Sequence, residues 1–94
     1  MKPHLVVNHP EKQRFEAQVE GELAYLEYDL QGSQLTLIHT EVPETLAGQG
    51  VGSALAQTAL ETARANQLKV VPLCPFVRNY LGHHPEYQDV LAGG

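Results

Sequence analysis

Three glycines at alternate positions form the stretch of this sequence that is best suited to binding a ligand. Gly48, Gly50 and Gly52 follow a run of strand-forming residues that ends at Pro43, and they open an amphipathic segment. Glycine lets a ligand approach the backbone closely, and the first amides of a helix lack partners within the helix and attract anions. The spacing therefore indicates a phosphate site. A tight connection between a strand and a helix, with no ligand, would give the same pattern.

The residues around this loop alternate first with the period of a strand and then with that of a helix. Apolar and polar residues alternate up to Val42, whereas the spacing changes to about 3.6 residues after Gly50. The turn-forming run at residues 31–33 predicts an antiparallel hairpin. The expected strands cover Leu5–Val7, Phe15–Val19, Leu23–Leu30, Leu35–Val42 and Lys69–Leu73, and the expected helices cover Gly50 to about Asn66, Phe76–Leu81 and Glu86–Leu91.

These elements predict an α/β (or α+β) fold: a mostly antiparallel sheet of about five strands, one main helix and a short C-terminal helical segment. The apolar run Lys69–Leu73 is typical of a central or parallel strand, and Pro72 would end its regular pairing. The main helix is expected to bury one face against the sheet. That face carries Val51, Leu55, Thr58, Ala59 and Thr62, with Ala54 and Ala63 beside it.

Length and composition fit one small domain over residues 1–94. The net charge of −5 and the scattered Lys and Arg residues argue against nucleic-acid and anionic-membrane partners. The N-terminal apolar run is too short for a signal peptide or a membrane span.

A single cysteine, Cys74, excludes an intramolecular disulfide and fits a reducing cytoplasm. Adjacent His83 and His84 lack further ligands at a suitable spacing, so no metal is expected. Both a monomer and a homodimer are consistent with the sequence.

The surroundings of the glycine loop exclude two nucleotide-binding motifs. A Walker loop places Lys and then Ser or Thr after the glycines at a fixed spacing, and this sequence does not. A dinucleotide-binding fold places its glycines after the first strand, whereas four expected strands precede Gly48. Neither nucleotide-binding motif therefore accounts well for the loop.

Residues 42–55, which read Val-Pro-Glu-Thr-Leu-Ala-Gly-Gln-Gly-Val-Gly-Ser-Ala-Leu, resemble motif A of the GCN5-related N-acetyltransferases. Two later blocks, Leu73–Val77 and His84–Tyr87, are similar to the small, single-domain branch of that superfamily. The resemblance extends from about Leu23 to Leu91. It implies an acyl-CoA N-acyltransferase-like fold and the transfer of an acetyl group from acetyl-coenzyme A to an amine acceptor.

The resemblance also implies which residues bind the coenzyme. The backbone of Thr40, Glu41 and Val42 would pair with the pantetheine arm as if the arm were an added strand. Asn79 and Tyr80 would lie near the coenzyme sulfur and the adenosine side. The backbone amides expected to hold the pyrophosphate belong to Gly48, Gln49, Gly50, Val51, Gly52 and Ser53.

Two departures from the family pattern bear on the expected site. Ala47 stands where the motif commonly has Arg or Gln, so help from a side chain at that position is missing, although backbone amides would still hold the phosphates. Larger members insert two helices between their first strands, whereas fewer than fifteen residues separate Val7 from Phe15 here. The acceptor side should therefore be open, or completed by a second subunit. An open site suits a lysine side chain or another amine on a large molecule.

Acetyl transfer needs a neutral amine next to the thioester and a proton for the departing thiolate. His39 and Glu41 share one face of their strand, and either could accept the amine proton, although both could be ordinary polar residues of a sheet. Tyr80 could protonate the thiolate or simply pack its helix. Cys74 could line the site or carry the acetyl group before transfer. A buried, inert cysteine is the alternative.

Two further functions are consistent with the sequence. A coenzyme A-binding module that lacks catalysis would keep the glycine loop, and Ala47 is compatible with it. The C-terminal Gly93-Gly94 is also a feature of sulfur-carrier proteins, but in those a strand leads into the two glycines, whereas a helical tail is expected here.

Overall fold

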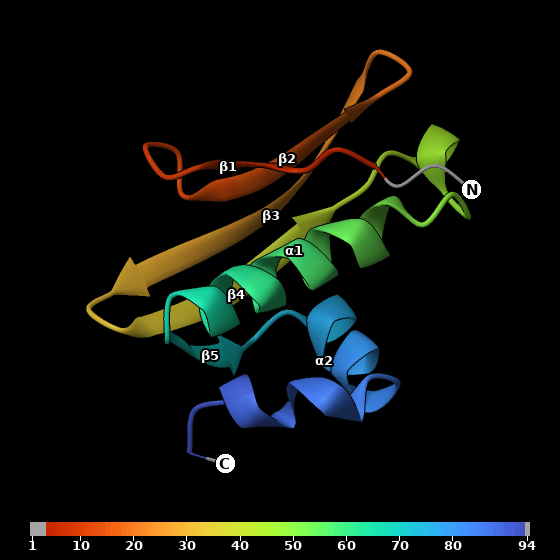
Figure 1. The fold of residues 1–94 in the computed structure, drawn as a ribbon. Coiled ribbons are helices and arrows are strands. Elements are labelled where there is room, and N and C mark those ends of the chain that lie inside the picture. Colours follow the sequence, from red (N-terminus) through yellow and green to blue (C-terminus); the bar gives the residue numbers. More distant parts are fainter. Residues whose placement is uncertain (1–3, 94) are drawn as a thin grey trace.

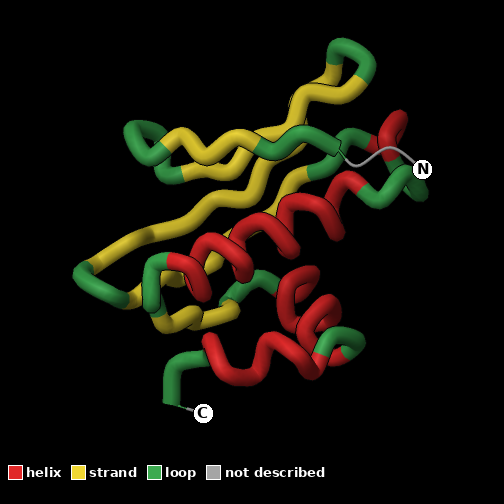
Figure 2. Tube along the Cα trace, viewed as in Figure 1, coloured by secondary structure: helices red, strands yellow, loops and turns green. Residues whose placement is uncertain are grey.

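The computed structural model describes residues 4–93 and has a mixed α/β fold built on a five-stranded sheet (Figures 1 and 2). This confirms the predicted fold class. In chain order the elements are β1 (Val7–His9), β2 (Arg14–Val19), β3 (Glu22–Gln31), β4 (Gln34–Glu41), the 3-10 helix η1 (Glu44–Leu46), α1 (Val51–Ala65), β5 (Lys69–Pro72), α2 (Pro75–Gly82) and the 3-10 helix η2 (Pro85–Val90).

The strands lie in the order in which they occur along the chain, β1-β2-β3-β4-β5. The first three pairings are antiparallel because short turns connect these strands, and β4 pairs with β5 in parallel because α1 crosses over between them. The prediction that the last strand is parallel is therefore confirmed. It is not central, however, since β5 is at one edge of the sheet.

The first strand begins later than the sequence predicts. Leu5 is exposed, and β1 pairs with β2 from Val7 opposite Glu16 to His9 opposite Arg14. A turn sets this register, because the amide of Lys12 donates to the carbonyl of His9 at 3.0 Å. The short connection leaves β1 and β2 joined without an intervening helix.

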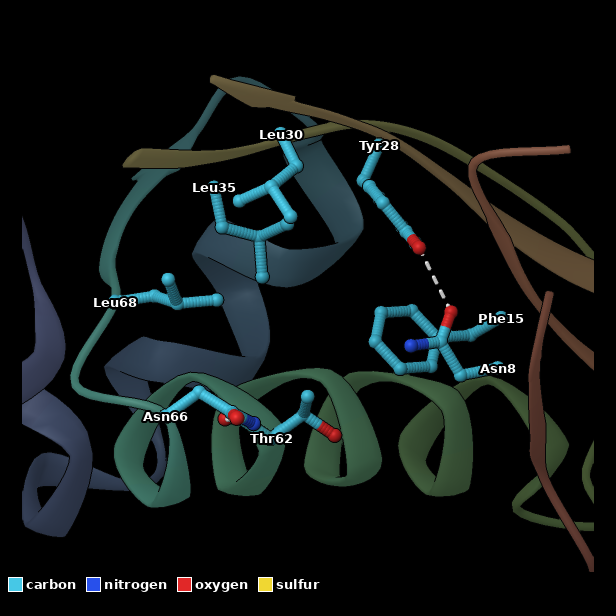
Figure 3. A pocket seen from close by; sticks show the side chains of 8 residues that line it. All are labelled: Asn8, Phe15, Tyr28, Leu30, Leu35, Thr62, Asn66 and Leu68. Carbon is cyan, nitrogen blue, oxygen red and sulfur yellow. Dashed lines mark hydrogen bonds between the residues drawn. The ribbon is translucent and has the colours of Figure 1, made fainter. Parts of the chain in front are cut away.

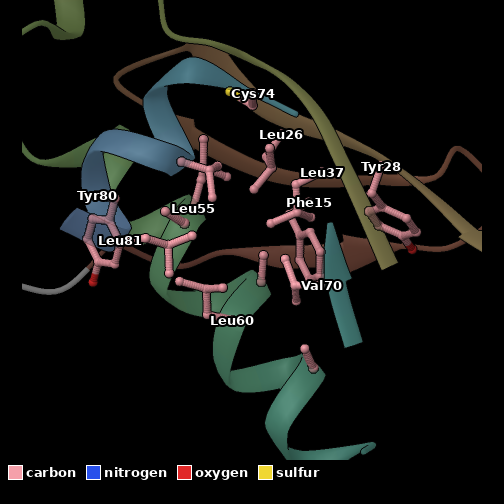
Figure 4. Close-up of a cluster of buried hydrophobic side chains, with 14 of the residues drawn as sticks. Phe15, Leu26, Tyr28, Leu37, Leu55, Leu60, Val70, Cys74, Tyr80 and Leu81 are labelled. Carbon is pink, nitrogen blue, oxygen red and sulfur yellow. The ribbon is translucent and has the colours of Figure 1, made fainter. Parts of the chain in front are cut away.

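Helix α1 covers one face of the sheet, and α2 and η2 pack beside it (Figures 1 and 4). The buried face of α1 differs from the predicted one, because Thr58 and Thr62 are only half-buried, whereas Ala56 and Leu60 are fully buried. The helix contacts the sheet on one side and the C-terminal helices on the other, so its buried surface is wider and rotated toward them. The buried residues of α1 are Val51, Gly52, Leu55, Ala56, Ala59, Leu60 and Ala63.

The C-terminal tail docks against α1 and β5. The hydroxyl of Tyr87 donates to Glu61 at 2.6 Å, and the guanidinium of Arg64 donates to Asp89 at 2.7 Å. The amide of Ala92 donates to the carbonyl of Val70 at 2.9 Å and extends the edge of the sheet. In the described part of the chain, no helix has the length and apolar character needed to cross a membrane.

Candidate active site

The glycine loop presents the start of α1 with its amides uncapped. Gly48 and Gly50 have φ of 82° and 79°, in the left-handed region where glycine is favoured, and Gly50 is the N-cap residue of α1. As a glycine, this residue has no side chain that could accept a hydrogen bond from the first amides of the helix. These amides are therefore free to bind an anion. The amide of Gln49 is different, because it already donates to the carbonyl of Leu46 at 3.2 Å.

A cavity of about 370 Å³ lies beside these amides. We refer to it as the loop cavity. Six of the predicted coenzyme-binding residues line it, and sequence reasoning did not assign Leu46 or Phe76 to the site. The ring of Phe76 is partly exposed in the fold, and an exposed aromatic ring often marks a binding surface. The sequence alone does not show that this ring is exposed. The lining residues are Val42, Leu46, Ala47, Gly48, Gly50, Val51, Gly52, Ser53 and Phe76.

Strands β4 and β5 diverge before the chain reaches Val42, which lines this cavity. They pair only from Gln34 to Leu37, where the amides of Leu73 and Cys74 both donate to the carbonyl of Leu37 at 3.0 Å. Beyond this point β4 pairs with β3 through Thr40 and Glu41, and among the described residues no strand pairs with its other edge. The second half of β4 therefore offers backbone groups to an extended ligand.

A β-bulge decides which way the side chains of this half of β4 point. Glu27 pairs with His39 and Tyr28 with Leu37, so Ile38 is one residue more than β3 can match. Leu37 points into the core before the bulge. After it, the even-numbered residues face inward, and Thr40 lies beside Cys74 with Oγ1 and Sγ 3.2 Å apart. The Cys74 side chain is thereby enclosed, at 2% exposure.

His39 and Glu41 point to the opposite face, which we call the outer face of the sheet. His39 donates from Nε2 to Oε1 of Glu41 at 2.9 Å, and both side chains are more than half exposed. The ring of Tyr25 meets the imidazole edge-on at a centroid distance of 6.3 Å. The predicted pair is thus brought together, but on the face away from Cys74.

Tyr80 and Asn79 do not line the loop cavity. The Tyr80 ring stacks on His84 at a centroid distance of 4.0 Å, and burial raises the pKa of its hydroxyl. Figure 4 shows Tyr80 at the far end of α2 from Cys74, with its hydroxyl directed away. The carbonyl of Asn79 accepts from Nδ1 of His83 at 3.0 Å. The roles assigned to Tyr80 and Asn79 stay predictions.

A second cavity, of about 350 Å³, lies under the C-terminal half of α1 (Figure 3). Phe15, Tyr28 and Leu35 form its apolar part, and the Tyr28 hydroxyl donates to Asn8 at 2.8 Å. Thr62 and Asn66 border it from the helix. It is at the other end of α1 from the glycine loop, so it is separate from the candidate active site. Over residues 4–93 no group of three or more His, Cys, Asp or Glu residues is arranged to hold a metal.

Comparison with known proteins is consistent with this geometry. The family described as GCN5-related N-acetyl-transferase matches residues 14–90. A solution NMR structure of a GCN5-like protein from Staphylococcus aureus is 30% identical, covers 100% of this chain and 93% of its own, and superposes with a TM-score of 0.74. The chain therefore belongs to the GCN5-related N-acetyltransferase family.

Alignments with two vertebrate relatives cover most of this chain. Protein NATD1 of Gallus gallus is 32% identical over 83 residues, which are 84% of this chain and 76% of that protein. Protein NATD1 of Homo sapiens is 31% identical over 83 residues, which are 84% of this chain and 74% of that protein. The family membership supports acyl transfer as the general class of activity.

Proposed function

We propose that this protein transfers an acetyl group from acetyl-coenzyme A to a primary amine. The observation that carries the proposal is the closeness of two features: the uncapped amides at the start of α1, which line the loop cavity together with Val42, and the unpaired edge of β4, which ends at Glu41 next to Val42. The first suits a pyrophosphate and the second suits an amide-containing arm such as pantetheine. One ligand that contains both groups in sequence is coenzyme A.

The two features assign the binding roles. The amides of Val51, Gly52 and Ser53 would hold the pyrophosphate together with the loop at Gly48 and Gly50. The backbone of Thr40, Glu41 and Val42 would pair with the pantetheine arm. Because Ala47 has no polar side chain, position 47 would add nothing to the backbone amides that hold the phosphates.

The acceptor amine is proposed to approach from the outer face. The dyad of His39 and Glu41 is exposed there, next to the free edge of β4. Since Nε2 of His39 donates to Glu41, Nδ1 is left to accept the amine proton. The amine nitrogen then attacks the thioester carbon and forms the new carbon–nitrogen bond. The carbon–sulfur bond breaks, and the departing thiolate takes up the proton that the nitrogen loses as it becomes an amide.

We further propose that the acetyl group passes directly from the coenzyme to the amine. Cys74 is enclosed against Thr40 on the inner side of β4, whereas the candidate base lies on the outer face. A thiol so placed lacks the adjacent base that an attacking cysteine needs.

The acceptor is proposed to be a lysine or another amine on a large molecule, because a turn of only a few residues joins β1 to β2 and leaves the acceptor side open.

Calorimetric titration with acetyl-coenzyme A, followed by a free-thiol assay with polylysine and with a polyamine, tests the proposal. Binding with turnover is expected, and His39→Ala should lower kcat by about 10²–10⁴-fold. Glu27→Gln is the matched control, since Glu27 is an exposed neighbour of His39 on β3. Binding without turnover on either amine would identify a coenzyme A-binding module instead. Absence of binding would refute both.

Three further expectations remain proposals: a single domain over residues 1–94, a cytoplasmic location and a monomeric or homodimeric state. A sulfur-carrier role is disfavoured by the tail, because the 3-10 helix η2 and not a long strand leads toward Gly93. Gly94 itself lies outside the described residues. A C-terminal thiocarboxylate detected by mass spectrometry would restore that alternative.

A further inference from the structure

The ring of Phe76 lies directly over the first turn of α1. A Cβ atom built on Gly52 would be 2.7 Å from Cζ of Phe76 and 3.2 Å from both Cε atoms. Such a separation is shorter than van der Waals contact, so the ring occupies the space that any side chain at position 52 would need. The ring also lines the loop cavity and is 40% exposed, so part of it remains free to contact a ligand.

Gly52 differs from the two glycines before it. Gly48 and Gly50 have positive φ, and a Cβ on either would meet no atom within 4 Å. Gly52 lies inside α1, where its backbone conformation is open to any residue. The lack of a side chain at position 52 therefore makes room for the aromatic ring from α2 where it lies, whereas glycine at the other two positions is favoured by their backbone conformation.

The position of the ring indicates which part of the coenzyme it would meet. In coenzyme A the group next to the pyrophosphate is the pantoyl segment, which carries a quaternary carbon with two methyl groups. If the pyrophosphate binds at the start of α1 and the arm runs to Val42, this dimethyl group must pass through the loop cavity. The apolar side chains that line this cavity include those of Val42, Leu46 and Phe76.

We propose that Phe76 is a coenzyme-positioning residue that receives the dimethyl group of the pantoyl segment, and that Gly52 is glycine in order to seat its ring. This inference rests on the proposed function, because it assumes that acetyl-coenzyme A is the ligand. Under this proposal, α2 contributes a side chain that contacts the coenzyme, in addition to the backbone amides of the glycine motif on α1. The ring would fix the bend at which the ligand turns from the helix amides to the edge of β4.

Titrations with two ligands separate this role from a general loss of folding. Phe76→Ala is expected to weaken acetyl-coenzyme A binding by about tenfold, the order that follows when two methyl groups lose an apolar wall. Phe76→Leu should retain most of the affinity. Adenosine 3′,5′-bisphosphate, which lacks the pantoyl arm, should bind equally to the unaltered protein and to Phe76→Ala when followed by amide chemical shifts. Leu73→Ala is the matched control, because Leu73 is 57% exposed and does not line the cavity.

A double-mutant cycle tests the pairing of the ring with Gly52. Gly52→Ala should weaken acetyl-coenzyme A binding in the presence of Phe76, because the new methyl group displaces the ring. It should have little further effect in the Phe76→Ala background. Thermal unfolding of each variant checks that the fold is retained, which is expected because the contacted atoms are at the free end of an exposed side chain.

The possible failures are distinguishable. Unchanged acetyl-coenzyme A affinity in Phe76→Ala would overturn the role of Phe76 and leave the proposed function standing. An equal loss from Gly52→Ala in both backgrounds would mean that glycine serves the approach of phosphate and would overturn the pairing. Failure of the unaltered protein to bind acetyl-coenzyme A would overturn the proposed function and, with it, the ligand assigned to Phe76.

Discussion

At the scale of single residues, the reactive side chains differ in exposure and in hydrogen bonding, and these differences indicate different roles. His39 and Glu41 are exposed and hydrogen-bonded to one another, whereas Cys74 is enclosed and contacts Thr40. Tyr80 is buried against His84. Since only the first pair is accessible to an incoming amine, these two residues are the best candidates for accepting its proton.

Replacing Cys74 by Ala is expected to leave most of the acetyl transfer intact, because the thiol is not proposed to carry the acetyl group. The loss of a buried sulfur should cost about 1–2 kcal/mol of unfolding free energy, as small cavities do. Steady-state turnover and the intact mass of the protein after mixing with acetyl-coenzyme A measure both consequences. Cys74→Ser, which keeps the size of the side chain, is the control. An acetylated wild-type protein together with an inactive but folded Cys74→Ala variant would contradict direct transfer.

At the scale of elements, two features build the site: the bulge in β4 and the divergence of β4 from β5. The extra residue Ile38 turns Thr40 inward and leaves His39 and Glu41 on the outer face. The paired amides of Leu73 and Cys74 on Leu37 end the parallel ladder. Because β5 ends at Pro72 and the chain continues into α2, the second half of β4 keeps a free edge for a ligand.

The rotation of the buried face of α1 gives a stability test at this scale. Leu60 is fully buried, and Leu60→Ala should lower the free energy of unfolding by about 2–5 kcal/mol through the cavity it leaves. Thr58→Ala should cost less than about 1 kcal/mol, because Thr58 is half-buried. Urea unfolding monitored by circular dichroism measures both. Equal losses would instead support the face predicted from the helical period, on which Thr58 was a core position.

At the scale of the whole molecule, the C-terminal tail closes the structure by docking on α1 and β5. The guanidinium of Arg64 donates to Asp89 and to the carbonyl of Glu86, and it lies over the ring of Tyr87 at 5.0 Å. The tail also bonds to Val70 at the edge of the sheet. These contacts hold η2 against the helix that carries the glycine loop, so tail docking and the position of α1 are linked.

Tail docking should weaken in acid. The hydrogen bond from Arg64 holds the pKa of Asp89 below its ordinary value of 3.8. A lowered pKa in the folded state means that the stabilisation is complete above the ordinary value and is lost as the pH falls through the lowered one. Melting temperatures of the wild type and Asp89→Asn should therefore differ at pH 6 and converge as the pH falls below 3.8 and through the lowered pKa of Asp89.

The comparison with Asp89→Asn isolates this one carboxylate, because Glu86, whose pKa is also lowered, titrates in both proteins. High salt at pH 6 should reduce the difference in melting temperature, since the ion pair is exposed. A difference that persists unchanged at low pH would show that Asp89 acts through something other than its charge.

The sequence by itself determined the local features of this protein. Alternation and short apolar runs predicted five strands, the change of period predicted α1, and the three glycines predicted a loop between a strand and that helix. These features depend on neighbours along the chain, so the sequence contains them directly. The block around Cys74 and Phe76 added the family, although it did not indicate which of these two side chains faces the cavity.

Only the tertiary structure decided how these pieces meet. The bulge at Ile38 depends on the register of β3 against β4, and it separates His39 and Glu41 from Cys74. The burial of Leu60 depends on helices that follow it in the chain. The contact of Phe76 with Gly52 joins residues from two helices. Strand alternation and helical period describe one element at a time, whereas each of these outcomes is set by packing between elements distant in sequence.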